Sequence, residues 1–274
     1  GEKWVGGARP TRFEHVFASI QSLTAAGLDD LAPDHFDVVI VDEFHHAAAK
    51  SYERLLDHVA PLELLGLTAT PERADGLSLL HRFDGRIAPE LRLWDAIDQH
   101  RLTPFTYYGI HDGLDLRQVP WRRGRGYDVD GLTNLYTASD AWARQVVKEV
   151  AERADDVATM RALGFCVSVD HARFMARVFN EAGVAAVAVW ADSPAGERQA
   201  ALRDLADGRV QVVFSVDLFN EGVDVPLVDT LLLLRPTDSP VLFLQQLGRG
   251  LRRAPGKSGG TGLDFVGPHR AEVR

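Results

Sequence analysis

The sequence is short of cysteine, of excess positive charge and of long apolar runs, and each shortage limits what the protein can be. The single cysteine, Cys166, can form neither an internal disulfide nor a four-cysteine zinc site, which fits a reducing cytoplasm. No apolar run reaches the roughly 18 residues that a membrane-spanning helix needs, so we expect no membrane partner. Because the net charge is -9, any binding of nucleic acid must come from local basic patches.

The first residues, Gly1-Glu2-Lys3-Trp4, include neither an initiator methionine nor the layout of a signal peptide. We therefore expect a processed chain, or one cut from something longer. The length of 274 residues favours two medium-sized domains. The absence of a repeat of 20 to 50 residues disfavours solenoids and propellers.

Short β-branched runs alternate with helical patterns along the chain. We expect buried parallel strands at Phe36–Val41, Leu64–Thr68, Gly164–Val167, Val184–Val189, Val210–Phe214 and Thr230–Leu234. Apolar residues at helical spacing follow the first run (Tyr52, Leu55, Leu56, Val59) and precede the third (Trp142, Val146, Val147, Val150). The pattern predicts an α/β fold whose parallel sheets are covered on both faces. It is interrupted by glycine and proline between about Leu102 and Thr137, where we place a linker or insertion between residues 1–102 and 138–274.

Two carboxylates, Asp42 and Glu43, end the apolar run 38–41. Carboxylates are costly at the end of a buried strand unless a cation or a substrate meets them. The pair suits a magnesium-bound nucleotide, with Asp42 holding the ion through water and Glu43 deprotonating the attacking water. The acids could instead cap the following helix. His45 and His46 are adjacent, so they do not share a helix face as metal ligands would.

Three further segments carry polar groups after apolar runs. The hydroxyls of Thr68 and Thr70 would emerge beside the acids if the two strands are neighbours, although hydroxyls before a proline are also common in turns. Gly222 permits close backbone approach, and Asp224 can accept a hydrogen bond from a ribose hydroxyl. If their segment is helical, Arg249 and Arg252 project from one face and suit phosphate contact; the alternative is a solvated basic helix end.

The local basic patch 121–127 contains Arg122, Arg123 and Arg125 between a tryptophan and a tyrosine. Such a mixture can hold phosphates and stack on bases, but a flexible solvated loop explains it equally well.

Taken together, the segments resemble the motifs of superfamily two helicases. Asp42-Glu43-Phe44-His45 is similar to the DExH box, Thr68-Ala69-Thr70 to the Ser/Thr-Ala-Thr motif, residues 222–226 to GxDxP, and residues 245–252 to QxxGRxxR. Residues 17–23 look like the nucleic-acid-contacting strand before the DExH box, and residues 165–168 look like the opening of a second RecA-like domain. The run 68–73 and the pair Glu221-Gly222 resemble bacterial DExH translocases related to restriction-enzyme and DNA-repair motors more than DEAD-box RNA helicases.

The resemblance implies two RecA-like lobes that clamp ATP and Mg²⁺ between them and hold nucleic acid, DNA rather than RNA, across their top. It implies that Glu43 is the general base and Asp42 the magnesium holder, that Arg249 and Arg252 are arginine fingers, and that Thr68 and Thr70 couple hydrolysis to movement. Nucleotide contacts are implied for His45, Gly222, Asp224 and Gln245, and nucleic-acid contacts for Ser19, Gln21, Ser168, Ser215 and the three arginines of the basic patch.

One family motif, the GxxxxGK[ST] loop that cradles the phosphates, is absent from the sequence. In the sole Gly-Lys-Ser, residues 256–258, Leu251 replaces the earlier glycine, so we read 255–260 as an ordinary loop. We therefore expect a first lobe truncated at its N-terminus, an upstream P-loop segment as partner, and no ATP hydrolysis by this chain alone. The rival is a non-catalytic nucleic-acid-binding or scaffold module. A Rossmann-type enzyme is disfavoured because no GxGxxG follows a strand.

Overall fold

The computed structural model describes residues 1–28, 31–44, 50–68, 80–122, 126–218, 225–237 and 239–265. The chain divides into two compact units, Gly1–Glu90 and Leu91–Arg274, and each is described by itself. None of the helices in these ranges has both the length and the apolar character that crossing a membrane requires.

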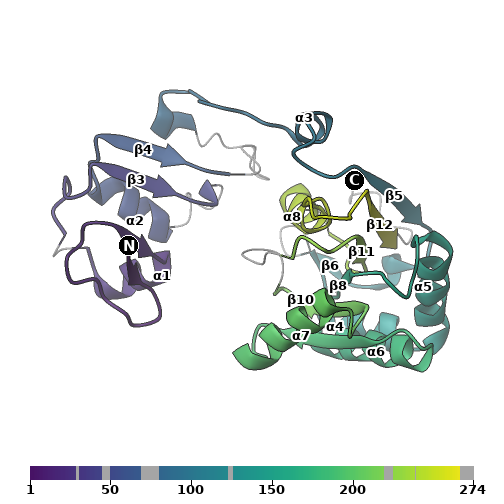
Figure 1. Ribbon diagram of the computed structural model, residues 1–274. Coiled ribbons are helices and arrows are strands. Elements are labelled where there is room, and N and C mark those ends of the chain that lie inside the picture. The colour runs from purple at the N-terminus through teal and green to yellow at the C-terminus, as the bar shows by residue number, and fades with distance from the viewer. Residues whose placement is uncertain are drawn as a thin grey trace. The chain divides into compact units, whose positions relative to one another are not determined.

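The first unit contains two pairs of parallel strands (Figure 1). One pair is β1 (Glu2–Trp4) with β2 (Val16–Ala18), which leads into helix α1 (Ile20–Ala26). The other pair is β3 (Val38–Val41) with β4 (Glu63–Gly66), joined through α2 (Lys50–His58). A 3₁₀ helix at Leu80–Phe83 follows. The expected strands at 36–41 and 64–68 are confirmed, with shifts of one or two residues at their ends.

The pair β3 and β4 has two unlike faces, because successive side chains of a strand point to opposite sides. Val41 lies on the covered face, where it clusters with Phe44 and Leu56 of α2. The other face is apolar and open, with Val38 55% and Ile40 60% exposed. Within the part of this unit that the structure describes, the covered core is therefore small.

The second unit is built on a parallel sheet of six strands within the described residues, in the order β5-β12-β11-β8-β10-β9. The strands are β5 (Phe105–Ile110), β8 (Ala162–Phe165), β9 (Ala186–Trp190), β10 (Val212–Val216), β11 (Thr230–Leu233) and β12 (Gly260–Phe265). The helices are α3 (Leu93–Asp98), α4 (Val129–Thr137), α5 (Asp140–Arg153), α6 (Val169–Glu181), α7 (Ala195–Asp207) and α8 (Pro240–Gly250). All four strands expected in this half are confirmed.

Helices cover both faces of this sheet (Figure 1). Leu232 of β11 packs in the cluster that contains residues of α4, α5 and α6. Its neighbours Leu231 and Leu233 point the other way, into the cluster that contains residues of α7 and α8. Successive side chains of this buried strand thus contribute to the hydrophobic cores on the two faces of the sheet, as expected for a parallel sheet that is covered on both sides. The expected helix through Trp142 and Val150 is confirmed as α5.

Residues 103–137, expected to be a linker or an insertion between two domains, lie within the second unit. The division falls between Glu90 and Leu91, and β5 pairs with β12 as the edge strand of the sheet. Helix α4 contributes Leu132 and Tyr136 to the core. Glycine and proline are common in linkers, and their frequency here suggested one. In the structure they lie between or within elements that bury apolar side chains, and amino-acid composition alone cannot predict that burial.

Two local expectations are also corrected. The segment 17–23 is not one strand, because β2 ends at Ala18 and Ser19 caps helix α1, its hydroxyl accepting from the backbone N–H of Ser22 at 3.2 Å. The patch 121–127 is not a plain loop. Its described residues form an antiparallel pair of two-residue strands, β6 (Trp121–Arg122) and β7 (Gly126–Tyr127).

Candidate functional site

The acid pair sits where β3 ends. Asp42 and Glu43 directly follow Val41, with Asp42 exposed and Glu43 half-buried. The backbone N–H of Glu43 donates to a carboxylate oxygen of Asp42 at 2.9 Å. Glu43 has a φ of 49°, in the left-handed region that residues other than glycine rarely adopt. Strain of this kind persists only where the surroundings impose it, and it is concentrated at functional sites.

The next residue, Phe44, supplies those surroundings. Its ring is 3% exposed and meets Phe83 edge-on, with centroids 4.9 Å apart. Its backbone N–H donates to the carbonyl of Leu67 at 2.8 Å, beyond the end of β4. A side chain on Gly66 would collide with the same ring, since its Cβ would lie 2.9 Å from it. Phe44 therefore anchors the turn that carries the acids.

Thr68 lies at the same edge of the sheet. Strands β3 and β4 are parallel neighbours with Val41 opposite Gly66, so the residues after both strands emerge together. This confirms the condition on which the grouping of Thr68 with Asp42 and Glu43 depended. Thr70 lies outside the described residues, as do His45, Gly222, Asp224, Arg123 and Arg125.

Ser168 and Ser215 occupy the carboxyl edge of the second sheet but differ in access. Ser168 is half-buried and caps α6, accepting from the backbone N–H of His171 at 3.2 Å. Ser215 is 1% exposed, and its hydroxyl donates to the carbonyl of Gly164 at 3.4 Å. The structure thus differs from the expectation for Ser215, because a side chain inside a central strand does not face solvent.

The sequence reasoning missed an ion pair at this same edge. Arg235, just after β11, pairs with Asp217, just after β10. Asp217 also has a left-handed φ of 48°. A charged residue directly after a buried strand was the signal that singled out Asp42, and the same signal would have found Asp217.

Gln245 and Arg249 lie on α8, with the Nε2 and Nε atoms of their side chains enclosed by protein. Arg252 does not extend the helical face, because α8 ends at Gly250 and Leu251 is its C-cap. The condition for an i, i+3 pair of arginines on one helical face, a helix that continues through Arg252, is therefore not met. Two glycines, Gly248 and Gly250, weaken the last turn.

In the basic patch, Arg122 is exposed on β6 and lies opposite Gly126 of β7. The pairing fixes the backbone on both sides of Arg123 and Arg125.

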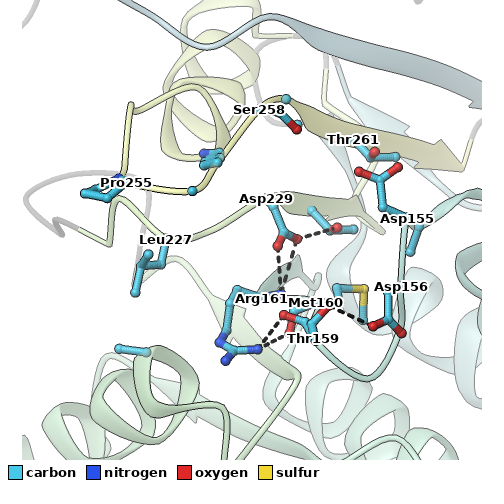
Figure 2. A pocket seen from close by; sticks show the side chains of 17 residues that line it. Asp155, Asp156, Thr159, Met160, Arg161, Leu227, Asp229, Pro255, Ser258 and Thr261 are labelled. Carbon is cyan, nitrogen blue, oxygen red and sulfur yellow. Dashed lines mark hydrogen bonds between the residues drawn. The ribbon is translucent and has the colours of Figure 1, made fainter.

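A cavity of about 290 Å³ lies at the opposite, amino edge of the second sheet (Figure 2). Arg161, Thr230 and Gly260 stand at the start of β8, β11 and β12 around it. Asp229, one of the charged residues that line it, accepts from the backbone N–H of Arg161 and, at 2.8 Å, from the hydroxyl of Thr230. Burial raises the pKa of Asp229. This cavity is separate from the carboxyl-edge residues that the sequence pointed to.

The acid pair fits Mg²⁺ in the kind of atom it offers, because carboxylate oxygens are the ligands that this ion takes, often through water. Within the described residues, no three His, Cys, Asp or Glu side chains gather as a metal site of their own. An ion held by Asp42 would thus need further ligands from a nucleotide or water.

Two family models match the chain. Residues 1–73 match "Type III restriction enzyme, res subunit", and residues 144–254 match "Helicase conserved C-terminal domain". A 51.5 kDa protein of Lactococcus phage (isolate 7-9) is 34% identical over 217 residues, which are 78% of this chain and 46% of the relative.

Two solved structures share the fold. A fragment described as an HsdR subunit of a type I restriction enzyme from Vibrio vulnificus YJ016 is 24% identical, with a TM-score of 0.74 over 96% of this chain and 49% of the other. The ATP-dependent Type ISP restriction-modification enzyme LlaBIII bound to DNA is 21% identical, with a TM-score of 0.65 over 92% of this chain and 19% of the other. The chain spans less than half the length of each of these three proteins. The fold is that of RecA-like helicase lobes, and with the two family matches in this order along one sequence, the chain belongs to the superfamily two helicases related to restriction-enzyme subunits.

Proposed function

We propose that this chain is part of an ATP-dependent helicase or translocase that moves on nucleic acid, with DNA as the substrate rather than RNA. One observation carries the proposal: the acid pair Asp42 and Glu43 ends a strand in a strained turn, beside the end of the strand that leads to Thr68. The DNA bound to LlaBIII, a protein of the same fold, supports the choice of DNA.

Each unit supplies its own groups to the reaction. In the first, Asp42 would hold Mg²⁺ through water. Glu43 would accept a proton from the attacking water while the oxygen of that water bonds to the γ-phosphorus and the β–γ bridging oxygen leaves with the electron pair. Magnesium, when bound, neutralises charge on the phosphates. In the second, Arg249 and Arg252 neutralise charge that develops on the transferred group. Gln245, together with Gly222, Asp224 and His45, is proposed to contact the nucleotide, and Thr68 with Thr70 to couple hydrolysis to movement.

The nucleic-acid contacts are proposed for Arg122, Arg123 and Arg125, for Ser168, and for Ser19 and Gln21 around the start of α1. Gln21 is exposed in the first turn of that helix. Ser215 is left out because its hydroxyl is buried.

We further propose that the 274 residues alone do not hydrolyse ATP, because they contain no GxxxxGK[ST] loop. Without it, two carboxylates would face a polyanion with no lysine to offset their repulsion. Hydrolysis should appear in the longest natural form of the protein that carries such a loop.

The test is nucleic-acid-stimulated ATP hydrolysis in that longer form, with Glu43→Gln beside it. We expect Glu43→Gln to keep ATP binding and to lose about a hundredfold or more in turnover, since the base is removed while size and hydrogen bonding are kept. Glu63→Gln, which changes an exposed acid on β4, is the matched control. A longer form that binds nucleic acid but shows no hydrolysis would instead support the non-catalytic rival.

A further inference from the structure

Lys257 lies in the loop between α8 and β12, in the Gly-Lys-Ser that the sequence indicated to be an ordinary loop. Its side chain turns into the protein. The ammonium Nζ donates to four backbone carbonyls: those of Gly250 at 2.6 Å, Arg252 at 2.9 Å, Pro226 at 3.4 Å, and Val228. An ammonium has three hydrogens, so the long contact to Pro226 is a shared one.

The four carbonyls belong to two segments that are distant in sequence. Pro226 and Val228 form the turn directly after the Gly222 to Asp224 region, and they lead into β11. Gly250 and Arg252 are at the end of α8, immediately around the arginines of the QxxGRxxR motif. One cation thus bridges the end of α8, which carries Arg249, and the turn that follows Gly222 and Asp224 in the sequence.

At the end of α8 this contact has a clear physical basis. The last carbonyls of a helix have no partner within the helix and carry partial negative charge, so a cation satisfies them. Leu251 lies between Gly250 and Arg252, and its carbonyl accepts from the backbone N–H of Thr103 at 2.8 Å. The hydroxyl of Thr103 also donates to the carbonyl of Arg252 at 3.2 Å. Of the two segments, Thr103 is therefore bonded only to the end of α8. Lys257 is bonded both to the end of α8 and to the 225–228 turn.

Stability alone does not explain a cation in this place. Burial lowers the pKa of Lys257 to about 8, and the nearby Asp229 opposes the shift without cancelling it. The charged form is thus disfavoured by its surroundings at neutral pH relative to water. A half-buried ammonium that loses part of its hydration yet is hydrogen-bonded to two distant segments is better explained by the geometry it imposes.

We propose that Lys257 is a positioning residue, which locks the 225–228 turn to the end of α8 and so fixes the helix end that carries Arg249 and Arg252 relative to the turn that follows Gly222 and Asp224 in the sequence. The role of those residues in ATP hydrolysis rests on the function proposed above, but the bridge itself does not.

The first experiment is amide hydrogen exchange on the 274-residue chain, comparing the parent with Lys257→Met. Methionine keeps the length of the side chain and removes its donors. We expect exchange to accelerate about tenfold or more in peptides covering both 225–229 and 248–254, because hydrogen bonds to a charged group are lost there. Thr103→Val should accelerate exchange in 248–254 only. Lys148→Met, which changes an exposed lysine of α5, should alter neither segment.

The second measurement separates positioning from general support. In the longer form that hydrolyses ATP, Lys257→Met should lower kcat about tenfold or more with a far smaller change in KM for ATP, and Thr103→Val should have the weaker effect. Acceleration in one segment alone, equal acceleration across the whole second unit, or a kcat within twofold of the parent would each overturn the proposal. If the unsubstituted longer form does not hydrolyse ATP, the proposed function is wrong. The hydrogen-exchange experiment then tests the Lys257 bridge by itself.

Discussion

The hydroxyl groups of Thr133 and Ser168 are hydrogen-bonded to each other at 2.7 Å. Thr133 belongs to α4, in the stretch whose composition indicated a linker, and Ser168 caps α6 at the carboxyl edge of the sheet. The bond shows that residues 129–137 help to shape the edge of the second unit where nucleic-acid contact is proposed.

Ser168→Ala should lower the free energy of unfolding of the second unit by about 1 kcal/mol, the usual loss for an N-cap. Thr133→Val should then cost less in the Ser168→Ala background than in the parent, because the shared hydrogen bond is already gone. Ser139→Ala removes the N-cap of α5 and is the matched control. Urea denaturation of the parent, the two single variants, the double variant and the Ser139→Ala control measures the coupling, and additive losses of unfolding free energy would refute it.

Arg249→Lys should lower ATP turnover by about a thousandfold or more in the longer form, because lysine keeps the charge but loses the planar fork of donors. Arg252→Lys should change ATP turnover by a factor of its own, separate from that of Arg249→Lys, since Arg252 lies beyond the end of α8. Arg144→Lys, an exposed arginine of α5 paired with Asp140, is the control. Steady-state ATP hydrolysis measures the change, and near-normal turnover in both variants would exclude them as arginine fingers.

Replacing Arg122, Arg123 and Arg125 together with alanine should weaken nucleic-acid binding and flatten its dependence on salt. The slope of log K against log salt should fall by up to about three, one for each lost phosphate contact. Arg144, Arg177 and Arg209 are paired with acids, and their joint replacement removes the same charge as a control. Fluorescence anisotropy across a salt series gives the slope for each of the two triple variants. Equal slopes would show that the basic patch makes no special contribution to nucleic-acid binding.

The second unit should lose stability as the pH falls below about 6.5, through His171. This side chain is fully buried and stacks on Tyr136 with centroids 4.8 Å apart. Burial lowers the pKa of His171 to about 3, so between these values the unfolded chain binds the proton and the folded chain does not. The free energy of unfolding therefore rises with pH in that window and declines as pH drops toward 3.

His171→Asn keeps an acceptor for the backbone N–H of Val167 and removes the titrating ring. Urea denaturation at several pH values should give a shallower decline below pH 6.5 for this variant than for the parent. Parallel curves would show that other groups carry the acid sensitivity.

Phe44→Ala should destabilise the first unit by about 3 to 5 kcal/mol, since it empties the centre of a small core. Phe17→Ala changes a ring that is 70% exposed in the same unit and should cost about 0.5 kcal/mol or less. Hydrogen exchange within Gly1–Glu90 measures the difference. Similar exchange in the two variants would contradict the anchoring role of Phe44.

Strand positions could be predicted because buried β-branched runs such as 38–41 and 230–233 leave a strong signal in a sequence. Strands β5 and β12 were missed because their residues are interrupted by glycine, and their burial depends on neighbours far along the chain. Among the site residues, Asp42 and Glu43 follow a strand and could be found from that position alone. Lys257 could not, since nothing local distinguishes a lysine that reaches four carbonyls from one that points into water.

The unequal size of the two hydrophobic cores has a consequence for how the chain melts. The first unit gathers its buried cluster around Val41, Phe44 and Leu56, whereas the second fills two clusters on either side of a six-stranded sheet. A calorimeter heating this chain should therefore record two transitions, an early small one and a later large one, so that no single midpoint describes its thermal stability.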